Sequence, residues 1–263
     1  MKTIPRLRHK ILGIEHGNFS PSLQSREQFL VQMERAKGLL SKSITTIFAP
    51  SVGFTNKLAE FGQDDDVFTP WLVRTKNKAD AGLTQKPGVA IAFCNADCPI
   101  ICLWQDTKLA VLHGGYRCLI RENPAENGIL ETAMQKLDPA KTSAFIFGGI
   151  GPCCWVPEND KPEIQNPNLC RHPEFLTKSL SKTTRSPLGK NLVSVDLYKL
   201  SRLILLKEGF LAEKIGWNPT CTCCYSVQDN GEPAYWSHIR FLAEQKAEQK
   251  TIDGRNFTVA WLE

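Results

Sequence analysis

Apolar runs separated by short polar breaks dominate residues 90–121. The first run ends at the turn that carries Cys98, and the third run ends at His113. Continuous apolar runs of this length are typical of strands buried on both faces. The polar break at 105–108, between the second and third runs, predicts a hairpin. We therefore expect strands that fold back on one another and bring Cys98 and His113 to neighbouring strand ends.

Apolar residues at three-to-four spacing predict helices in other parts of the chain. Ser25 and Gln28 form a capping-box pattern in front of a periodic segment over 29–40. Further helices are expected over 129–137 and over 196–208, the last of them ended by a glycine. These three segments are the helical part of the predicted fold.

Shorter apolar runs complete the pattern. Strands are expected at 44–48, 144–147 and 257–261, whereas the charged stretch 62–78 is expected to be a loop. Strands and helices alternate irregularly, and no internal repeat is present. The sequence therefore predicts a layered α/β or α+β fold with a mixed β-sheet, formed as a single domain by residues 1–263.

Composition narrows the class of protein. Of the 263 residues, 42% are hydrophobic and 22% are charged, which is ordinary for a globular protein. The net charge of +5 is scattered along the chain, so nucleic acid is not an expected partner. No signal peptide and no run of membrane-spanning length is found, so we expect a cytoplasmic protein without a membrane partner.

The chain contains ten cysteines, but their placement does not predict a disulfide framework. Cys153-Cys154 is a vicinal pair, and the 221–224 segment reads Cys-Thr-Cys-Cys. Reduced thiols are the expected state in a chain of this length. The 221–224 segment lacks a second Cys-x-x-Cys and histidine partners, so core packing is favoured there over a metal site.

Cys98 and His113 are the first candidates for chemistry. A thiol and an imidazole in contact can hold a soft divalent metal ion, or the imidazole can activate the thiol as a nucleophile. The structural alternative is a free buried cysteine beside a hydrogen-bonded histidine. From this pair of residues alone, that alternative is favoured.

Several short motifs nevertheless follow one another in a recognisable order across residues 79–255. They are Ala79-Asp80-Ala81 with Thr84, Ala96-Asp97-Cys98 with Pro99, His113-Gly114-Gly115-Tyr116-Arg117, Ile150-Gly151-Pro152-Cys153-Cys154, Asp196-Leu197, Cys221-Thr222, and Trp236-Ser237-His238-Ile239-Arg240 with Gly254-Arg255. In this order the chain resembles the laccase-domain family, also called polyphenol oxidase or peptidoglycan editing factor. The resemblance implies a compact α/β domain and a cytoplasmic enzyme with a metal ion held by one Cys and two His.

The resemblance assigns two of these three ligands. Cys98 matches the family's cysteine ligand and His113 its second histidine ligand, whereas Val52 stands where the first histidine is expected. A site with two protein ligands is expected to bind zinc more weakly than a complete one. Copper is less favoured than zinc, because the chain lacks the histidines needed to build several copper sites.

The resemblance also implies a substrate class. The expected activity is phosphorolysis or deamination of purine nucleosides at a pocket of Cys98 and His113, with zinc as the expected cofactor. One alternative is an amidase that edits a peptidoglycan precursor, with Cys98 as nucleophile, His113 as base, and Asn95 or a backbone carbonyl as orienter. Another is a non-catalytic paralogue with a binding or regulatory role.

The expected partner is therefore a small molecule: a nucleoside, phosphate or a peptidoglycan precursor. Arg117 and Arg240 are candidates for binding an anionic group of such a substrate, together with Asn95.

Overall fold

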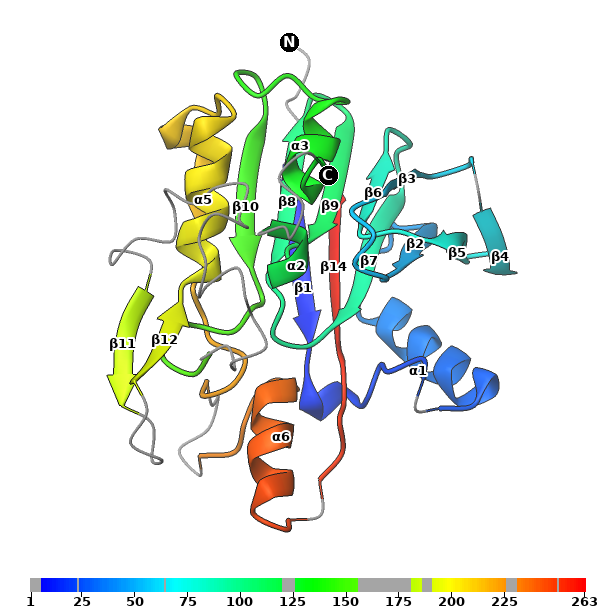
Figure 1. Ribbon diagram of the computed structural model, residues 1–263. Coiled ribbons are helices and arrows are strands. Elements are labelled where there is room, and N and C mark those ends of the chain that lie inside the picture. The colour runs from blue at the N-terminus through cyan, green and yellow to red at the C-terminus, as the bar shows by residue number, and fades with distance from the viewer. Residues whose placement is uncertain are drawn as a thin grey trace.

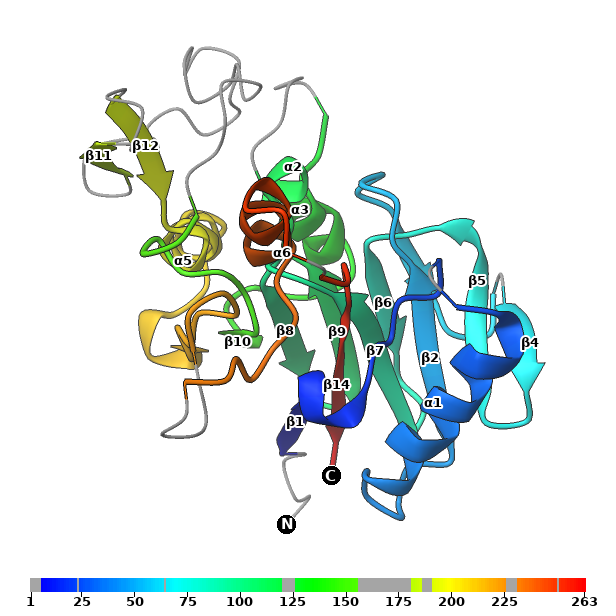
Figure 2. The ribbon, with the colours of Figure 1, turned by 90° about the horizontal axis from the view of Figure 1, so that it is seen from below.

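Two six-stranded sheets of mixed strand direction lie face to face, with helices on their outer faces (Figures 1 and 2). The structure is a computed structural model that describes residues 6–22, 24–63, 65–119, 126–155, 181–185, 191–225, 231–249 and 251–263. Within these ranges the strands form the two six-stranded sheets and one separate two-stranded hairpin.

Sheet 1 is built from both ends of the chain and from its first half. Its order is β1 (Leu7–Leu12), β14 (Asn256–Leu262), β7 (Val89–Asn95), β2 (Thr46–Ser51), β5 (Leu72–Lys78) and β4 (Asp65–Thr69). The strands β7, β2 and β5 run parallel, and the remaining neighbours are antiparallel.

Sheet 2 contains the strands around the predicted site. Its order is β13 (Ile215–Trp217), β10 (Ser143–Phe147), β8 (Ile100–Gln105), β9 (Lys108–His113), β6 (Ala81–Thr84) and β3 (Leu58–Glu60). β8 and β9 form the predicted hairpin, with Gln105 opposite Lys108. The outer pairs β10–β13 and β3–β6 are parallel. A separate hairpin consists of β11 (Ser181–Arg185) and β12 (Asn191–Val195).

Side-chain alternation along β7 explains why its apolar run is continuous. Ile91 and Phe93 point into a core between the two sheets, whereas Ala90 and Ala92 point to the outer face of sheet 1. Both faces of the strand are covered, so neither tolerates a polar residue. The expectation of strands buried on both faces is confirmed here.

Helices cover the two outer faces. α1 (Arg26–Gly38) packs on sheet 1, and the predicted capping box is present, with Ser25 as N-cap and Gln28 as its partner. The other face is covered by α2 (Tyr116–Leu119), α3 (Ile129–Met134) and α5 (Leu197–Lys207). Figure 2 shows α1 and α5 on opposite sides of the molecule. α6 (His238–Lys246) precedes the last strand.

The expected loop over 62–78 is wrong, because this stretch contains β4 and β5. Leu72 and Val73 are buried, and β5 pairs with β2 on one side and with β4 on the other. The charged residues lie toward the edge of the sheet, where Lys and Asp are tolerated on solvent-facing positions. Tertiary pairing therefore outweighs the polar composition. In the described ranges no helix combines the length and apolar character needed to cross a bilayer.

Candidate functional site

Asp80 and His113 face each other across neighbouring strands of sheet 2. β6 pairs antiparallel with β9 from Ala81 opposite Leu112, and the His113 N–H donates to the Asp80 carbonyl at 2.8 Å, which extends this ladder by one pair. Side chains alternate along a strand, so His113 lies on the same face as Val111, which belongs to the inter-sheet core. The side chains meet with His113 Nδ1 3.4 Å from Asp80 Oδ1, as an ion pair without hydrogen-bond alignment.

Cys98 approaches the same ring from the turn between β7 and β8. Ile100 is opposite His113 in the β8–β9 pairing, and Cys98 lies two residues before it. The Cys98 thiol contacts the His113 ring. A Cβ added to Gly115 would lie 3.0 Å from His113 Cε1 and 3.3 Å from Cys98 Sγ, so glycine leaves room between them. The structure thus brings Cys98 and His113 together, with Cys98 in the turn between β7 and β8 and His113 as the last residue of β9.

Asn95 holds the backbone of this turn in place. Its side-chain Nδ2 donates to the carbonyls of Cys98 at 3.0 Å and Gly148 at 3.1 Å, and its Oδ1 accepts from the Thr258 hydroxyl. The side chain is buried. The side-chain group that faces His113 as orienter is the carboxylate of Asp80, not Asn95.

The Asp80 carboxylate also fixes the loop that follows β2. It accepts hydrogen bonds from the backbone N–H groups of Gly53 at 3.3 Å, of Phe54 and Asn56 at 3.0 Å, and of Thr55. Burial alone would raise the pKa of Asp80, but the contact with His113 and these N–H donors lower it to about 2. The side chain therefore stays ionised although it is fully buried.

His113 sits between groups of negative charge. Burial alone would lower the pKa of the imidazole, but the charge of Cys98 and the contacts with Asp80 and Cys118 raise this pKa well above its ordinary value. Without a metal ion, these surroundings therefore favour the protonated form of the ring. It can pass that proton to a bound molecule or give it up to a metal ion.

Val52 and Phe54 lie in the loop after β2. Val52 packs against the inter-sheet core and offers no donor atom, in line with the missing first histidine. The Phe54 ring lies 5.3 Å from the His113 ring in an edge-on arrangement, and the residue is 50% exposed. Phe54 thus stands between His113 and solvent.

Cys118 offers a sulfur atom as a possible metal ligand, whereas Val52 has no ligand atom. It lies on α2, and its sulfur, a nitrogen of His113 and an oxygen of Asp80 all lie within 4.8 Å of one another. Imidazole and thiolate are ligands that zinc prefers, and a carboxylate on the other ring nitrogen is the usual support of a ligating histidine. His113 and Cys118 therefore offer donor atoms that suit a thiophilic metal ion, and the Asp80 carboxylate lies against the same ring. Cys98 contacts this ring but lies outside the group of three.

The two predicted arginines have different surroundings. Arg117 is exposed on α2, four residues after His113. Arg240 donates to the backbone carbonyls of Cys223 at 2.7 Å and of Tyr235, and it pairs with Glu244 on its own helix. Arg240 also lines a cavity of 290 Å³ beside α6. If Arg240 binds a substrate, it does so while it keeps these contacts within the protein.

Asp97 connects the Cys98 turn to two distant segments. Its Oδ1 accepts from the Thr222 hydroxyl at 2.8 Å, and its Oδ2 accepts from the Ile239 N–H at the start of α6, also at 2.8 Å. The neighbouring His238 contacts Asp253 through Nδ1 at 3.1 Å. These contacts explain why Asp97 and the segment around His238 both belong to the motifs.

The amino-acid sequence matches the sequence model of one protein family. The sequence model described as multi-copper polyphenol oxidoreductase laccase matches residues 47–263. The chain belongs to this family. The resemblance inferred from the motifs is therefore confirmed. A search of curated proteins gives no match.

Several solved structures share the fold. The hypothetical protein YfiH of Bacillus licheniformis is 17% identical with a TM-score of 0.68, covering 94% of this chain and 85% of that one. YlmD of Geobacillus stearothermophilus is 19% identical with a TM-score of 0.68, covering 98% and 90%. The predicted class, an α/β fold with mixed sheets, is confirmed.

Three residues of the site were not predicted as such. Asp80 lies in a recognised motif, but its role depends on the β6–β9 register, which the sequence does not specify. Cys118 belongs to no recognised motif, and only the folded structure brings its sulfur close to His113. Phe54 has no sequence signal beyond its place next to Gly53, two residues from Val52.

Proposed function

We propose that this laccase-domain protein is an enzyme that acts on a purine nucleoside or a related small molecule at the pocket of Cys98 and His113. The observation that carries the proposal is the row Asp80, His113 and Cys98 on one face of sheet 2. A buried carboxylate holds an imidazole against a partly exposed thiol. This arrangement suits proton transfer to or from a bound molecule.

Phosphorolysis of a purine nucleoside needs a proton at the leaving base. The reaction breaks the bond between C1′ of the ribose and N9 of the base, joins phosphate to C1′, and leaves a proton on the base. His113 is the proposed proton donor to the base, and Asp80 keeps its ring in place. Arg117, which is exposed beside the site, is the proposed contact for phosphate.

Zinc is the metal we propose for this site. Cys98, His113 and Cys118 are the residues that would hold it, and zinc would supply a positive charge that polarises a substrate oxygen or lowers the pKa of a bound water. Copper is less suitable, since the chain has five histidines and, of those that the structure describes, only His113 belongs to this donor group.

The test measures turnover of adenosine and inosine with and without phosphate. We expect release of the free base that depends on phosphate, and we expect Cys98→Ser and His113→Ala to reduce kcat at least about a hundredfold. Arg117→Ala is expected to raise the KM for phosphate while kcat changes less. Cys94→Ser is the matched control, because Cys94 lies on the same turn-forming strand but packs on the outer face of sheet 1.

Two results would overturn the proposal. One is full turnover by Cys98→Ser or His113→Ala. The other is a folded wild-type protein that releases neither base nor ammonia from any purine nucleoside. Tight nucleoside binding without turnover would instead point to the non-catalytic paralogue, which the valine at position 52 favours.

A second candidate is amide hydrolysis with Cys98 as a covalent nucleophile. The same row supports it, because thiol, imidazole and carboxylate stand in the order nucleophile, base and orienter. The substrate would be an amide of a peptidoglycan precursor. Activity that resists chelators, is abolished by alkylation of Cys98 and proceeds through an acylated Cys98 would favour this function over phosphorolysis.

A further inference from the structure

Two cysteine-bearing turns lie side by side at one edge of sheet 2. Cys153 and Cys154 follow β10, and Cys221 and Cys224 follow β13. β10 and β13 are parallel neighbours, so their carboxyl ends reach the same edge of the sheet. Thiols that are about seventy residues apart in the chain are brought together in this way.

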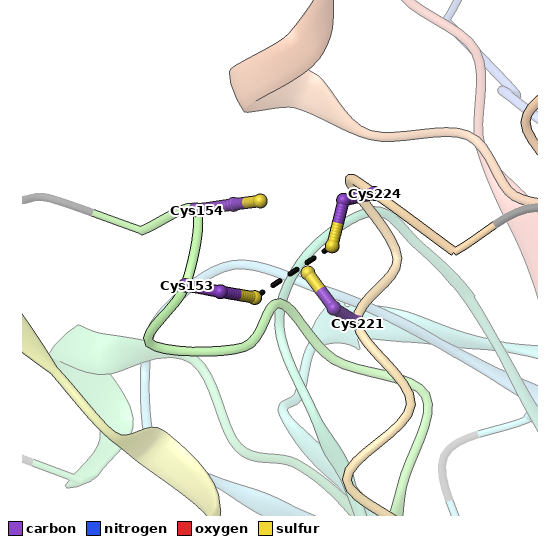
Figure 3. A group of neighbouring side chains, drawn as sticks. All are labelled: Cys153, Cys154, Cys221 and Cys224. Carbon is purple, nitrogen blue, oxygen red and sulfur yellow. Dashed lines mark hydrogen bonds between the residues drawn. The ribbon is translucent and has the colours of Figure 1, made fainter.

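The four sulfur atoms point toward a common space (Figure 3). All four lie within 4.8 Å of one another, and the sulfurs of Cys153 and Cys224 are 3.7 Å apart. A disulfide would require about 2.05 Å. Four thiolates around a tetrahedral zinc ion, with Zn–S bonds of about 2.3 Å, lie roughly 3.8 Å from each other. The spacing therefore matches ligands of a shared ion.

The surrounding backbone supports a negatively charged sulfur. The backbone N–H groups of Gly151, Cys224 and Cys223 are directed at the Cys221 sulfur. N–H donors directed at ligating sulfurs are typical of metal–thiolate sites. Arg240 of α6 adds a cation near this segment, because its guanidinium donates to the Cys223 carbonyl.

Gly151 leaves the space for this group. A Cβ at this position would lie 3.0 Å from Cys153 Sγ and 3.6 Å from Cys221 Sγ. Several thiols this close repel one another when ionised, and a cation between them removes that repulsion.

We propose that Cys153, Cys154, Cys221 and Cys224 form a four-thiolate zinc site that is separate from the pocket of Cys98 and His113. Each thiol gives its proton to solvent when it coordinates, so binding releases up to four protons and leaves a complex of charge −2. Cys221 and Cys224 have the Cys-x-x-Cys spacing of structural zinc sites, and the vicinal pair supplies the other two ligands.

The ion would join the turn that carries Cys153 and Cys154 to the turn that carries Cys221 and Cys224. Thr222 lies inside the Cys221–Cys224 loop, and its hydroxyl donates to Asp97, the residue before Cys98. Zinc at this edge would therefore hold the loop that supports the Cys98 turn. The role is structural, and it is independent of the reaction at Cys98.

The test uses the full chain in a Cys98→Ser background, which weakens zinc binding at the other pocket. Reduced, chelator-treated protein is titrated with zinc alone and with cobalt(II) alone. We expect one tightly bound zinc ion, a rise in melting temperature, and the strong sulfur-to-cobalt charge-transfer absorption of a thiolate site. Mass-mapped alkylation should show the four thiols protected at least about tenfold by zinc.

Variants in this background assign the ligands. Cys221→Ser and Cys153→Ser should abolish the cobalt absorption, whereas Cys223→Ser should retain it. Cys223 is the matched control, because it lies in the same loop but its sulfur is not in the group of four. Circular dichroism establishes whether each variant is folded.

The alkylation pattern needs no variant at the four positions, so it tests the proposal even where a variant fails to fold. Three results would overturn it: a Cys153–Cys224 disulfide in protein purified under reducing conditions, zinc binding that Cys221→Ser leaves undiminished, or thiols that zinc does not protect.

Discussion

His113 Nδ1 lies 3.4 Å from Asp80 Oδ1, and the same two residues are joined through their backbones by an N–H···O bond of 2.8 Å. This double contact follows from the register of β6 and β9, which places the pair at the end of their ladder. The position of the imidazole is therefore fixed by strand pairing as well as by charge. Any change at Asp80 acts on both His113 and the loop over 53–56.

The first prediction concerns the pH dependence of stability in chelator-treated protein. The pKa of Asp80 is lowered from 3.8 to about 2, because His113 and backbone N–H groups outweigh the effect of burial. A lowered folded-state pKa gives stability that is complete above the ordinary value and is lost as the pH falls toward the folded value.

We therefore expect Asp80 to contribute about 2 kcal/mol above pH 4 and to lose this contribution between roughly pH 4 and pH 2. Asp80→Asn should remove this pH dependence. Denaturant unfolding of both proteins across this range measures the difference. Parallel stability curves for the two proteins would contradict the prediction.

Gly115 is expected to tolerate no side chain. In Gly115→Ala the new Cβ would lie 3.0 Å from His113 Cε1, 3.1 Å from Phe54 Cε1 and 3.3 Å from Cys98 Sγ. We expect turnover and metal binding to fall at least about tenfold, since small displacements of reacting groups are costly.

Gly38→Ala is the control for this change. Gly38 is the last residue of α1 and has open space around its Cβ position, so alanine should stabilise the helix by about 0.5–1 kcal/mol. Kinetics and thermal melting of the two variants provide the comparison. Equal activity of Gly115→Ala and wild type would show that the pocket is wider than described.

Phe54 has a backbone conformation that favours glycine, with φ at 53°. Phe54→Gly and Phe54→Ala both remove the ring that shields His113, so alkylation of Cys98 should become faster in both. The glycine variant should be more stable than the alanine variant by about 1 kcal/mol, because only glycine adopts this region without cost. Denaturant unfolding measures the order, and the reverse order would contradict it.

Val52→His tests the position of the missing ligand. If position 52 corresponds to the family's first histidine, the variant should bind zinc more tightly than wild type beside Cys98 and His113. Without metal we expect a modest loss of stability, because a polar ring replaces an apolar side chain packed on the core.

Zinc should more than reverse this loss, with about 2.7 kcal/mol gained at a hundredfold excess over Kd. Thermal melting with and without zinc measures the response, and Val52→Ala serves as the size control. An equal zinc response in wild type and variant would mean that position 52 does not face the metal.

Local sequence patterns predict those strands and helices whose own residues favour the structure. The capping box of Ser25 and the run ending at His113 are examples, because propensity and burial agree there. The prediction of a loop over 62–78 is wrong, because the strands there form by pairing with strands that are remote in the chain. The order of motifs identified the family, and with it Cys98 and His113.

The rest of the site depends on pairings that no local pattern contains. Asp80 becomes the partner of His113 only through the β6–β9 register, and Cys118 reaches the ring only through the turn into α2. The four-cysteine group requires β10 and β13 to lie parallel and adjacent. Each of these contacts is well defined in the folded protein, but no spacing of residues in the sequence indicates it.

The Asp80–His113 pair and the Cys98 turn all belong to the uninterrupted segment 80–118. The relative positions of these donor atoms are therefore set by strand pairings inside one continuous stretch of chain. A described connection outside this stretch, such as residues 39–45 between α1 and β2, can change in length without moving the donor atoms relative to one another. A graft of a new loop there would retain the same reactive groups.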